Sequence, residues 1–316
     1  MLIEILLPLL LGGALLAGGG EALVSGSAGT ARRLGLSPVV IGVLLIGFGT
    51  STPELLTSVE AARLGTPDIA LGNVLGSNTC NILLIGGVAA LLSPMVLRKD
   101  AFRFDLWVAV FVALTLALAL VAGPLTPMLG ALFLLSLAVY AVVALTAGAS
   151  QGNTDEAPGL APVLWRSLLI ALAGLVAALF GARLFVEGAV ELARLFDLSE
   201  AAIGATVVAV GTSLPELATS VMAARRGQPE LAVGNIIGSN IFNVLGVLGA
   251  TLMVSEIVPA PEALWRDLPV MAGMTLVLAV MCAGFGRAGR VNRYEGAVLV
   301  AAFLAYTGYL VLTAGA

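Results

Sequence analysis

The residues that decide the fold form a 35-residue stretch that the chain carries twice. The first copy is GFGTSTPELLTSVEAARLGTPDIALGNVLGSNTCN at Gly47–Asn81, and the second is AVGTSLPELATSVMAARRGQPELAVGNIIGSNIFN at Ala209–Asn243. The copies lie 162 residues apart, and 21 of their 35 positions are identical. The same shift carries Gly12, Gly19 and Gly26 onto Gly174, Gly181 and Gly188. This agreement predicts a chain built from two equivalent halves.

The composition of the whole chain is that of a membrane protein. Of the 316 residues, 59% are hydrophobic and only 11% are charged, whereas a soluble domain has roughly 25% charged residues. The hydrophobic residues fall in runs of about 20, long enough to cross the hydrocarbon core of a bilayer. We therefore expect a polytopic, all-α membrane protein whose main neighbour is the lipid bilayer. The sequence suggests no nucleic acid partner, no obligate protein partner and no permanently bound cofactor.

Ten transmembrane helices are predicted, five in each half. They are Ile3–Thr30, Ser37–Leu64, Asp68–Leu92, Phe104–Ala122, Pro127–Ala147, Val163–Phe196, Ser199–Arg226, Glu230–Val254, Asp267–Gly284 and Arg293–Thr313. The only linker-like segment is 148–162, which contains two acids and two prolines. It separates a first repeat at 1–147 from a second repeat at 163–316.

The distribution of basic residues predicts the orientation of these spans. Most basic residues lie in the connections after spans 1, 3, 5, 7 and 9: Arg32, Arg33, Arg98, Lys99, Arg103, Arg166, Arg225, Arg226, Arg287, Arg290 and Arg293. Because positive charge marks the cytoplasmic side, we expect a cytoplasmic linker and extracellular termini in the cell (plasma) membrane. Since each half has an odd number of spans, the second repeat has inverted topology relative to the first.

Each repeat carries the pattern Gly-Thr-Ser-x-Pro-Glu in the middle of an apolar span, at Gly49–Glu54 and Gly211–Glu216. Proline removes a backbone donor and glycine loosens the helix, so we expect a break at each pattern. Carbonyl groups freed at bilayer depth are tolerated only where they face protein or a polar cavity. Hydroxyl and carboxylate oxygens gather at the same level: Thr50, Ser51, Glu54, Thr212, Ser213 and Glu216.

The next span of each repeat adds more oxygens. Ser77 and Asn81 are four residues apart and share a helix face, as do Ser239 and Asn243. Asn73 and Asn235 precede them by one turn on similar faces. Carboxylates, hydroxyls and amide carbonyls form an oxygen-only ligand set, and the chain has no histidine. This set favours hard cations such as calcium and sodium over zinc or copper.

The two glutamates are the strongest functional signal, because an intramembrane carboxylate is a functional site by default. At a separation of about 6 Å and an effective dielectric near 20, two carboxylates repel by roughly 3 kcal/mol. An empty site should therefore take up cations or a proton. One calcium ion neutralises both acids, and sodium ions can do so in its place. Alternative occupancy of one site is what an exchanger needs.

At these residues the sequence resembles the cation/calcium exchanger superfamily, in its prokaryotic sodium/calcium exchanger branch. The resemblance is carried by GTSTPE and GNVLGSN in the first repeat and by GTSLPE and GNIIGSN in the second. It implies that helices 2, 3, 7 and 8 are broken around a cation site at the midplane, and that helices 1 and 6 slide as a pair. It also implies cation ligands at the hydroxyls, amides and acids named above, and at the carbonyls of Gly47 and Ala209.

One position departs from part of that superfamily. Some members, including the potassium-dependent branch, have aspartate where this chain has Asn243, so the resemblance argues against potassium dependence. The transported ions are then expected to be calcium and sodium, or protons in place of sodium.

Three alternatives to a sodium/calcium exchanger stay open at the level of sequence. A calcium/proton antiporter of the same fold would use the paired acids to carry protons, although the hydroxyl ligands favour sodium. An intramembrane hydrolase would use the acids as acid and base, but no GxGD, HExxH or GxSxG pattern accompanies them, so we do not expect an enzyme. A passive cation channel fits poorly with two matched charges at one depth.

Overall fold

The computed structural model describes residues 2–97, 99–149, 163–196, 207, 209–283 and 289–314. The predicted linker 148–162 lies outside the described residues from residue 150 onward. The first part of the predicted span Ser199–Arg226 also lies outside them, up to residue 208 with the exception of residue 207. Where the chain is described, it forms helices and one short two-stranded ribbon.

The elements follow the order of the predicted spans. The first half contains α1 (Leu2–Leu34), α2 (Pro38–Ile41), η1 (Gly42–Gly47), α3 (Phe48–Thr50), α4 (Thr52–Arg63), α5 (Pro67–Cys80), η2 (Asn81–Gly86), α6 (Gly87–Leu92), β1 (Met95–Leu97), α7 (Lys99–Ala122) and α8 (Pro127–Ala149). The second contains α9 (Leu164–Leu195), α11 (Ala209–Gly211), α12 (Leu214–Arg225), α13 (Pro229–Phe242), η4 (Asn243–Leu248), α14 (Gly249–Leu252), η5 (Ala263–Asp267), α15 (Leu268–Ala283), β2 (Gly289–Val291) and α16 (Arg293–Ala314). The η elements are π-helical turns.

The secondary structure repeats together with the sequence. The bounds of α4 and α12 differ by 162 residues at both ends, and so do those of α5 and α13 and of η2 and η4. Equivalent residues of the two halves therefore adopt equivalent local structure around both motifs.

Eight helices in the described parts of the chain are long and apolar enough to cross a membrane. The bent pair Pro38–Thr50 and Thr52–Arg63 makes a ninth if it is counted as one span. These nine correspond to predicted spans 1–6 and 8–10. Because the seventh span is described only in part, the number ten stays a prediction.

The predicted helix breaks are present at the two Gly-Thr-Ser-x-Pro-Glu patterns but not in the third and eighth spans. The second span bends by 43° at Ser51, and its repeat equivalent Ser213 separates α11 from α12. The third and eighth spans, by contrast, run without a break through Pro67–Leu92 and Pro229–Leu252. They contain the π-helical turns η2 and η4 instead, so the prediction of broken helices 3 and 8 was wrong. Neither contains an internal proline, and a π-helical turn accommodates one extra residue while the helix continues.

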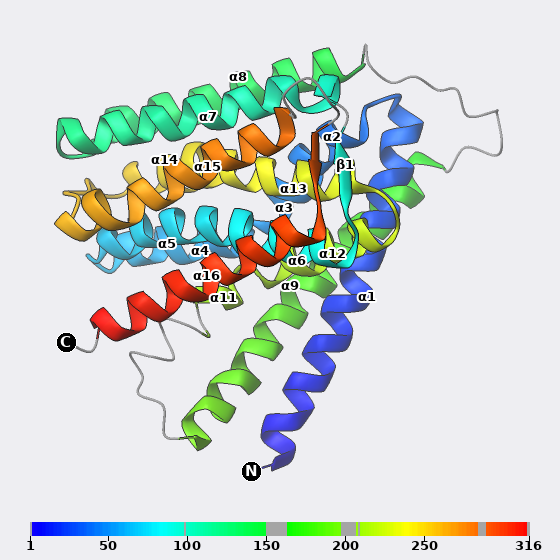
Figure 1. Ribbon diagram of the computed structural model, residues 1–316, viewed down its shortest axis with the longest axis horizontal. Coiled ribbons are helices and arrows are strands. Elements are labelled where there is room, and N and C mark those ends of the chain that lie inside the picture. The colour runs from blue at the N-terminus through cyan, green and yellow to red at the C-terminus, as the bar shows by residue number, and fades with distance from the viewer. Residues whose placement is uncertain are drawn as a thin grey trace.

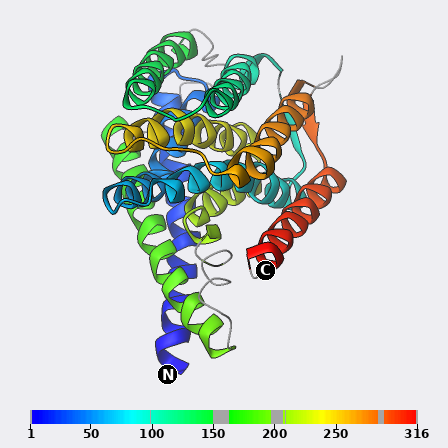
Figure 2. The same cartoon turned by 90° about the vertical axis from the view of Figure 1, so that its left-hand side faces the viewer.

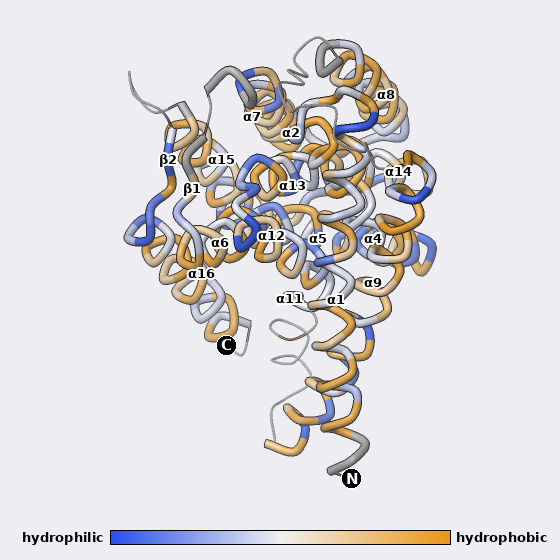
Figure 3. The backbone as a smooth tube through the Cα atoms, turned by 90° about the vertical axis from the view of Figure 1, so that its right-hand side faces the viewer, coloured by the Kyte–Doolittle hydropathy of each residue, from blue (hydrophilic) through white to orange (hydrophobic). Residues whose placement is uncertain are grey.

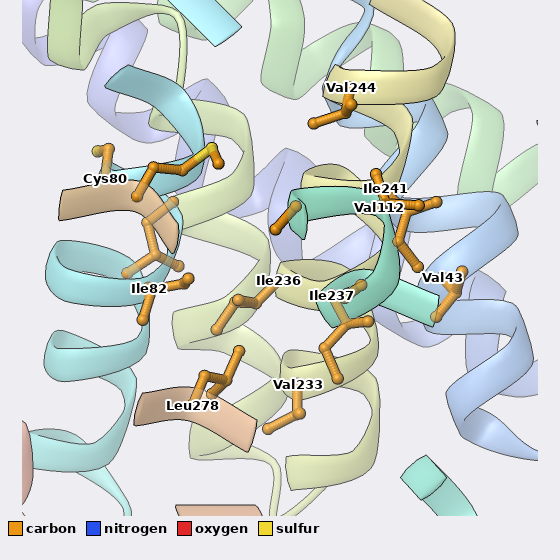
Figure 4. Close-up of a cluster of buried hydrophobic side chains, with 14 of the residues drawn as sticks. Val43, Cys80, Ile82, Val112, Val233, Ile236, Ile237, Ile241, Val244 and Leu278 are labelled. Atoms are coloured by element: carbon orange, nitrogen blue, oxygen red, sulfur yellow. The ribbon is translucent and has the colours of Figure 1, made fainter. Parts of the chain in front are cut away.

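The third and eighth spans form the centre of the bundle. Within their most apolar windows 78% and 94% of residues are buried, against 17–44% for the other single-helix spans. Figure 4 shows the packing around α13, where Ile236, Ile237 and Ile241 meet side chains from η1, η2, α7 and α15. The outer helices α7, α8, α15 and α16 are largely hydrophobic (Figure 3). Many of their large hydrophobic side chains are exposed, as in lipid-facing helices. The centre of the bundle is thus screened from lipid.

α1 and α9 form a separate antiparallel pair that crosses the bundle at a steep angle (Figures 1 and 2). Their backbones touch at glycines that the two repeats share. A Cβ atom at Gly19 would lie 2.8 Å from the carbonyl oxygen of Gly174, and one at Gly181 would lie 2.9 Å from that of Gly12. Any side chain at these positions would push the helices apart, so these glycines allow the two helices to pack closely. Sliding of the pair stays a prediction.

The ribbon was not predicted from the sequence, which indicated helices alone. β1 pairs with β2 in antiparallel register, with Met95 opposite Val291 and Leu97 opposite Gly289. The strands follow predicted spans 3 and 9, and an isolated bridge joins Leu125 to Ile257 in the connections after spans 4 and 8. Odd-numbered connections therefore pair with odd ones and even with even, as alternating spans require.

Candidate cation site

The two predicted acids occupy equivalent places at the starts of short helices. Glu54 lies in the first turn of α4 and Glu216 in the first turn of α12, each directly after a proline. Proline is tolerated there because the first amides of a helix have no carbonyl partner. The positive end of each helix dipole favours a carboxylate at this place. Both acids are 1% exposed, so the bends bring two carboxylates into the protein interior.

The serines at the two bends connect the repeats. Ser51 Oγ donates to Glu216 Oε1 at 3.0 Å, and Ser213 Oγ donates to Glu54 Oε1 at 3.4 Å. Each acid is therefore bound by the hydroxyl group of the opposite repeat. The two bends therefore meet in the interior of the protein.

Two further asparagines hold the acid-bearing helices in place. Asn73 Nδ2 donates to the carbonyl oxygen of Glu54 at 3.3 Å and to Ser58 Oγ at 2.9 Å. In the second repeat, Asn235 Nδ2 donates to the carbonyl oxygen of Glu216 at 3.2 Å and to a serine hydroxyl at 2.9 Å. These bonds tie α5 to α4 and α13 to α12. The serines, Ser58 and Ser220, were not predicted, although both lie at matched positions of the repeated stretch.

The other predicted hydroxyl and carbonyl ligands lie around the same bends. Thr50 Oγ1 donates to the Ile46 carbonyl at 3.0 Å and lies 3.3 Å from Asn235 Oδ1. Ser239 Oγ donates to the carbonyl of Gly47 at 3.2 Å, so this carbonyl faces the opposite repeat. Three more predicted ligands complete the set: Ser77 is buried on α5, Ala209 begins α11, and Thr212 lies in the turn before α12.

Asn81 and Asn243 are each the first residue of a π-helical turn, η2 or η4. Asn81 Nδ2 donates to Asn240 Oδ1 at 3.0 Å, and Asn243 Nδ2 donates to Asn78 Oδ1 at 3.0 Å. Each of the two side chains therefore uses its amino end for this bond, and its carbonyl end points the other way. Asn78 and Asn240 were not predicted as part of the site; the signal available was their identity in both copies of the stretch.

Four oxygen atoms of the site have no hydrogen-bond partner. Among the described residues, six buried side-chain nitrogen or oxygen atoms are unpaired, and four of them are Glu54 Oε2, Glu216 Oε2, Asn81 Oδ1 and Asn243 Oδ1. Leaving a buried polar group unpaired is costly, and such groups normally find a partner. Oxygens of two acids and two amides, one of each from either repeat, suit a hard cation. Cation binding by these residues stays a prediction.

Comparison with known proteins gives consistent matches over almost the whole chain. The family model described as "Sodium/calcium exchanger protein" matches residues 5–146 and 166–312. The "Putative antiporter CaxA" of Alkalimonas amylolytica is 38% identical over 305 residues, covering 94% of this chain and 95% of that protein. The "Sodium/calcium exchanger MaX1" of Methanosarcina acetivorans is 32% identical over 342 residues, covering 94% and 96%. A solved structure of the sodium-calcium exchanger NCX_Mj superimposes with a TM-score of 0.85 at 32% identity, covering 96% of this chain and 98% of that one.

Proposed function

Because the chain belongs to the sodium/calcium exchanger family, we propose that it is a secondary active antiporter that exchanges calcium for sodium by alternating access. The family is one of multi-pass membrane transporters and not one of enzymes, which leaves no support for the hydrolase alternative. The observation that carries the proposal is the set of four unpaired buried oxygens from Glu54, Glu216, Asn81 and Asn243.

Calcium is proposed as one of the transported ions because the two acids match its charge and the neutral oxygens match its preference for oxygen ligands. Two carboxylates supply two negative charges, which one divalent ion neutralises. The neutral ligands are amide, hydroxyl and backbone carbonyl oxygens, all of which calcium accepts. Ser51 and Ser213 already touch the acids, so a small rotation of each hydroxyl presents its oxygen to an ion.

Sodium is proposed as the countertransported ion because the site has more neutral oxygens than a proton needs. A proton requires only one of the unpaired carboxylate oxygens, whereas a sodium ion requires several oxygens around it. A calcium/proton antiporter is the second candidate, supported by the same unpaired Oε2 atoms of Glu54 and Glu216.

The proposed transport cycle uses ten spans in two inverted repeats, with the ion site between them. The antiparallel contact of the repeat-equivalent helices α1 and α9 supports the inversion. We propose that these two helices slide as a pair, that the termini are extracellular, and that the linker 148–162 is cytoplasmic in the plasma membrane.

Transport into proteoliposomes tests this function. The purified protein is reconstituted, the membrane potential is clamped, and uptake of isotopic calcium is measured under imposed sodium, proton and potassium gradients. We expect uptake that follows the sodium gradient, persists when the pH gradient is collapsed and does not depend on potassium. Uptake that follows only the proton gradient would replace the leading proposal with the second candidate, and uptake without any gradient coupling would contradict both.

A further inference from the structure

Two asparagines that are not among the expected cation ligands form a reciprocal pair at the centre of the molecule. Asn78 of α5 and Asn240 of α13 are repeat equivalents, 3% and 5% exposed. Asn78 Nδ2 donates to the carbonyl oxygen of Asn240 at 3.2 Å, and Asn240 Nδ2 donates to that of Asn78 at 3.4 Å. Each side chain therefore binds the backbone of the other repeat.

The side-chain oxygens of this pair have a second task. Asn78 Oδ1 accepts from Asn243 Nδ2, and Asn240 Oδ1 accepts from Asn81 Nδ2, both at 3.0 Å. These bonds cross between the repeats: Asn78 binds Asn243, which follows Asn240 in the second repeat, and Asn240 binds Asn81, which follows Asn78 in the first. Since the amino group and the side-chain oxygen of each residue are both hydrogen-bonded, neither Asn78 nor Asn240 can rotate without losing bonds on two sides.

The orientation of the ligand amides follows from these bonds. An asparagine side chain has a carbonyl end and an amino end, and half a turn about its last bond exchanges them. Because Asn81 and Asn243 bind the pair through Nδ2, their Oδ1 atoms point elsewhere, and both Oδ1 atoms are unpaired. A flipped amide would present an N–H donor where a cation requires an acceptor.

We propose, on the basis of the proposed function, that Asn78 and Asn240 are positioning residues that hold the amide oxygens of Asn243 and Asn81 toward the transported cation. They do not contact the ion. Asn78 acts on Asn243 of the second repeat and Asn240 acts on Asn81 of the first, so each half of the site is oriented by the other half.

The test exploits the crossed pairing. Asn78→Leu is close in size to the native residue but removes the acceptor for Asn243, and Asn240→Leu does the same for Asn81. We expect each variant to raise the KM for calcium about tenfold, the effect of losing one well-placed hydrogen bond, while the maximal rate changes little. A residue that only joined α5 to α13 would change thermal stability and leave the KM where it was.

Rescue identifies which amide each residue orients. A carboxylate presents oxygen on both sides, so aspartate needs no orienting bond. Asn243→Asp should restore the KM of the Asn78→Leu variant, and Asn81→Asp should restore that of Asn240→Leu. The opposite combinations add the same charge at the equivalent position and are the matched controls, in which we expect no restoration.

The measurement is isotopic calcium uptake into proteoliposomes together with binding of isotopic calcium to the purified protein. Unchanged KM values in both leucine variants, or equal rescue by both aspartates, would overturn the inference. If the leucine variants do not fold, Asn78→Ser and Asn240→Ser replace them, since a serine hydroxyl is too short to reach the amide. Absence of calcium uptake by the native protein would contradict the proposed function, whereas uptake with unspecific rescue would contradict only this inference.

Discussion

The two repeats agree in sequence around the site but differ in what they pack against. In α13, Gly234 and Gly238 are buried, and a Cβ atom at Gly238 would lie 2.6 Å from the Cα atom of Val43. Their equivalents in α5, Gly72 and Gly76, are exposed, and no described atom would lie within 4 Å of a Cβ at either position. Among the described residues, the same small-residue motif thus packs against η1 in one repeat and is exposed in the other.

This difference leads to a prediction about the side of the membrane from which the site is accessible. α13 begins at the connection predicted to be cytoplasmic, whereas α5 begins at the connection predicted to be extracellular. Both motifs lie in the first half of their spans, Pro229–Leu252 and Pro67–Leu92, so the packed motif of α13 is nearer the predicted cytoplasmic side and the exposed, open motif of α5 is nearer the predicted extracellular side. A site between inverted repeats must be closed toward one side when it is accessible from the other. From the surroundings of the glycines among the described residues, we predict that the site is closed toward the side where α13 begins.

The largest effect is expected at the acids, where the two repeats match. Glu54→Gln or Glu216→Gln removes half of the charge of the site, and loss of one partner of a buried charge pair costs about 3–5 kcal/mol. We expect calcium exchange to fall by a factor on the order of a hundred or more in both variants, with the protein still folded. Isotopic flux and thermal unfolding measure this. Strong loss in one variant alone would show that the acids are not equivalent.

A smaller effect should separate the two glycine motifs. Gly238→Ala forces a methyl group against the backbone of Val43, and overpacking of this kind costs about 1–3 kcal/mol. Gly76→Ala, at the equivalent position, meets no described atom and should leave stability unchanged. Thermal unfolding in detergent compares the two variants. Equal destabilisation would mean that α5 is packed as tightly as α13.

How much the sequence could predict follows from the same comparison. The buried acids, the bends at Ser51 and Ser213 and the matched positions of the polar side chains could be predicted because duplication, proline and intramembrane charge each leave a local signal. The difference between Gly72 and Gly234 could not, because identical residues take on different surroundings only through tertiary packing. The roles of Asn78 and Asn240 were missed for a similar reason, since their bonds cross between repeats 162 residues apart.

The orientation of the open motif can be measured by cysteine labelling. Gly76→Cys places a thiol on the exposed face of α5, one turn before the native Cys80, which is buried at 4% exposure. We expect an impermeant maleimide applied from outside to label the variant at least about tenfold faster than the native protein, because reaction requires an accessible thiolate. Labelling from the cytoplasmic side instead would reverse the predicted orientation, and no labelling from either side would show that the motif is closed.

The smallest expected effect concerns an ion pair between two helices that, among the described residues, has no counterpart at the repeat-equivalent position. Arg226, after α12, pairs with Glu21 of α1, whereas Arg183, the equivalent of Glu21, pairs with Glu187 of its own helix. The pair between α1 and α12 is partly exposed and is worth at most about 1 kcal/mol. If it holds α1 in the observed state, Glu21→Gln should lower the labelling rate of Gly76→Cys by up to about fivefold. Arg183→Gln is the matched control and should leave that rate unchanged; an equal change in both variants would show that surface charge in general, and not this contact, sets the balance between the two access states.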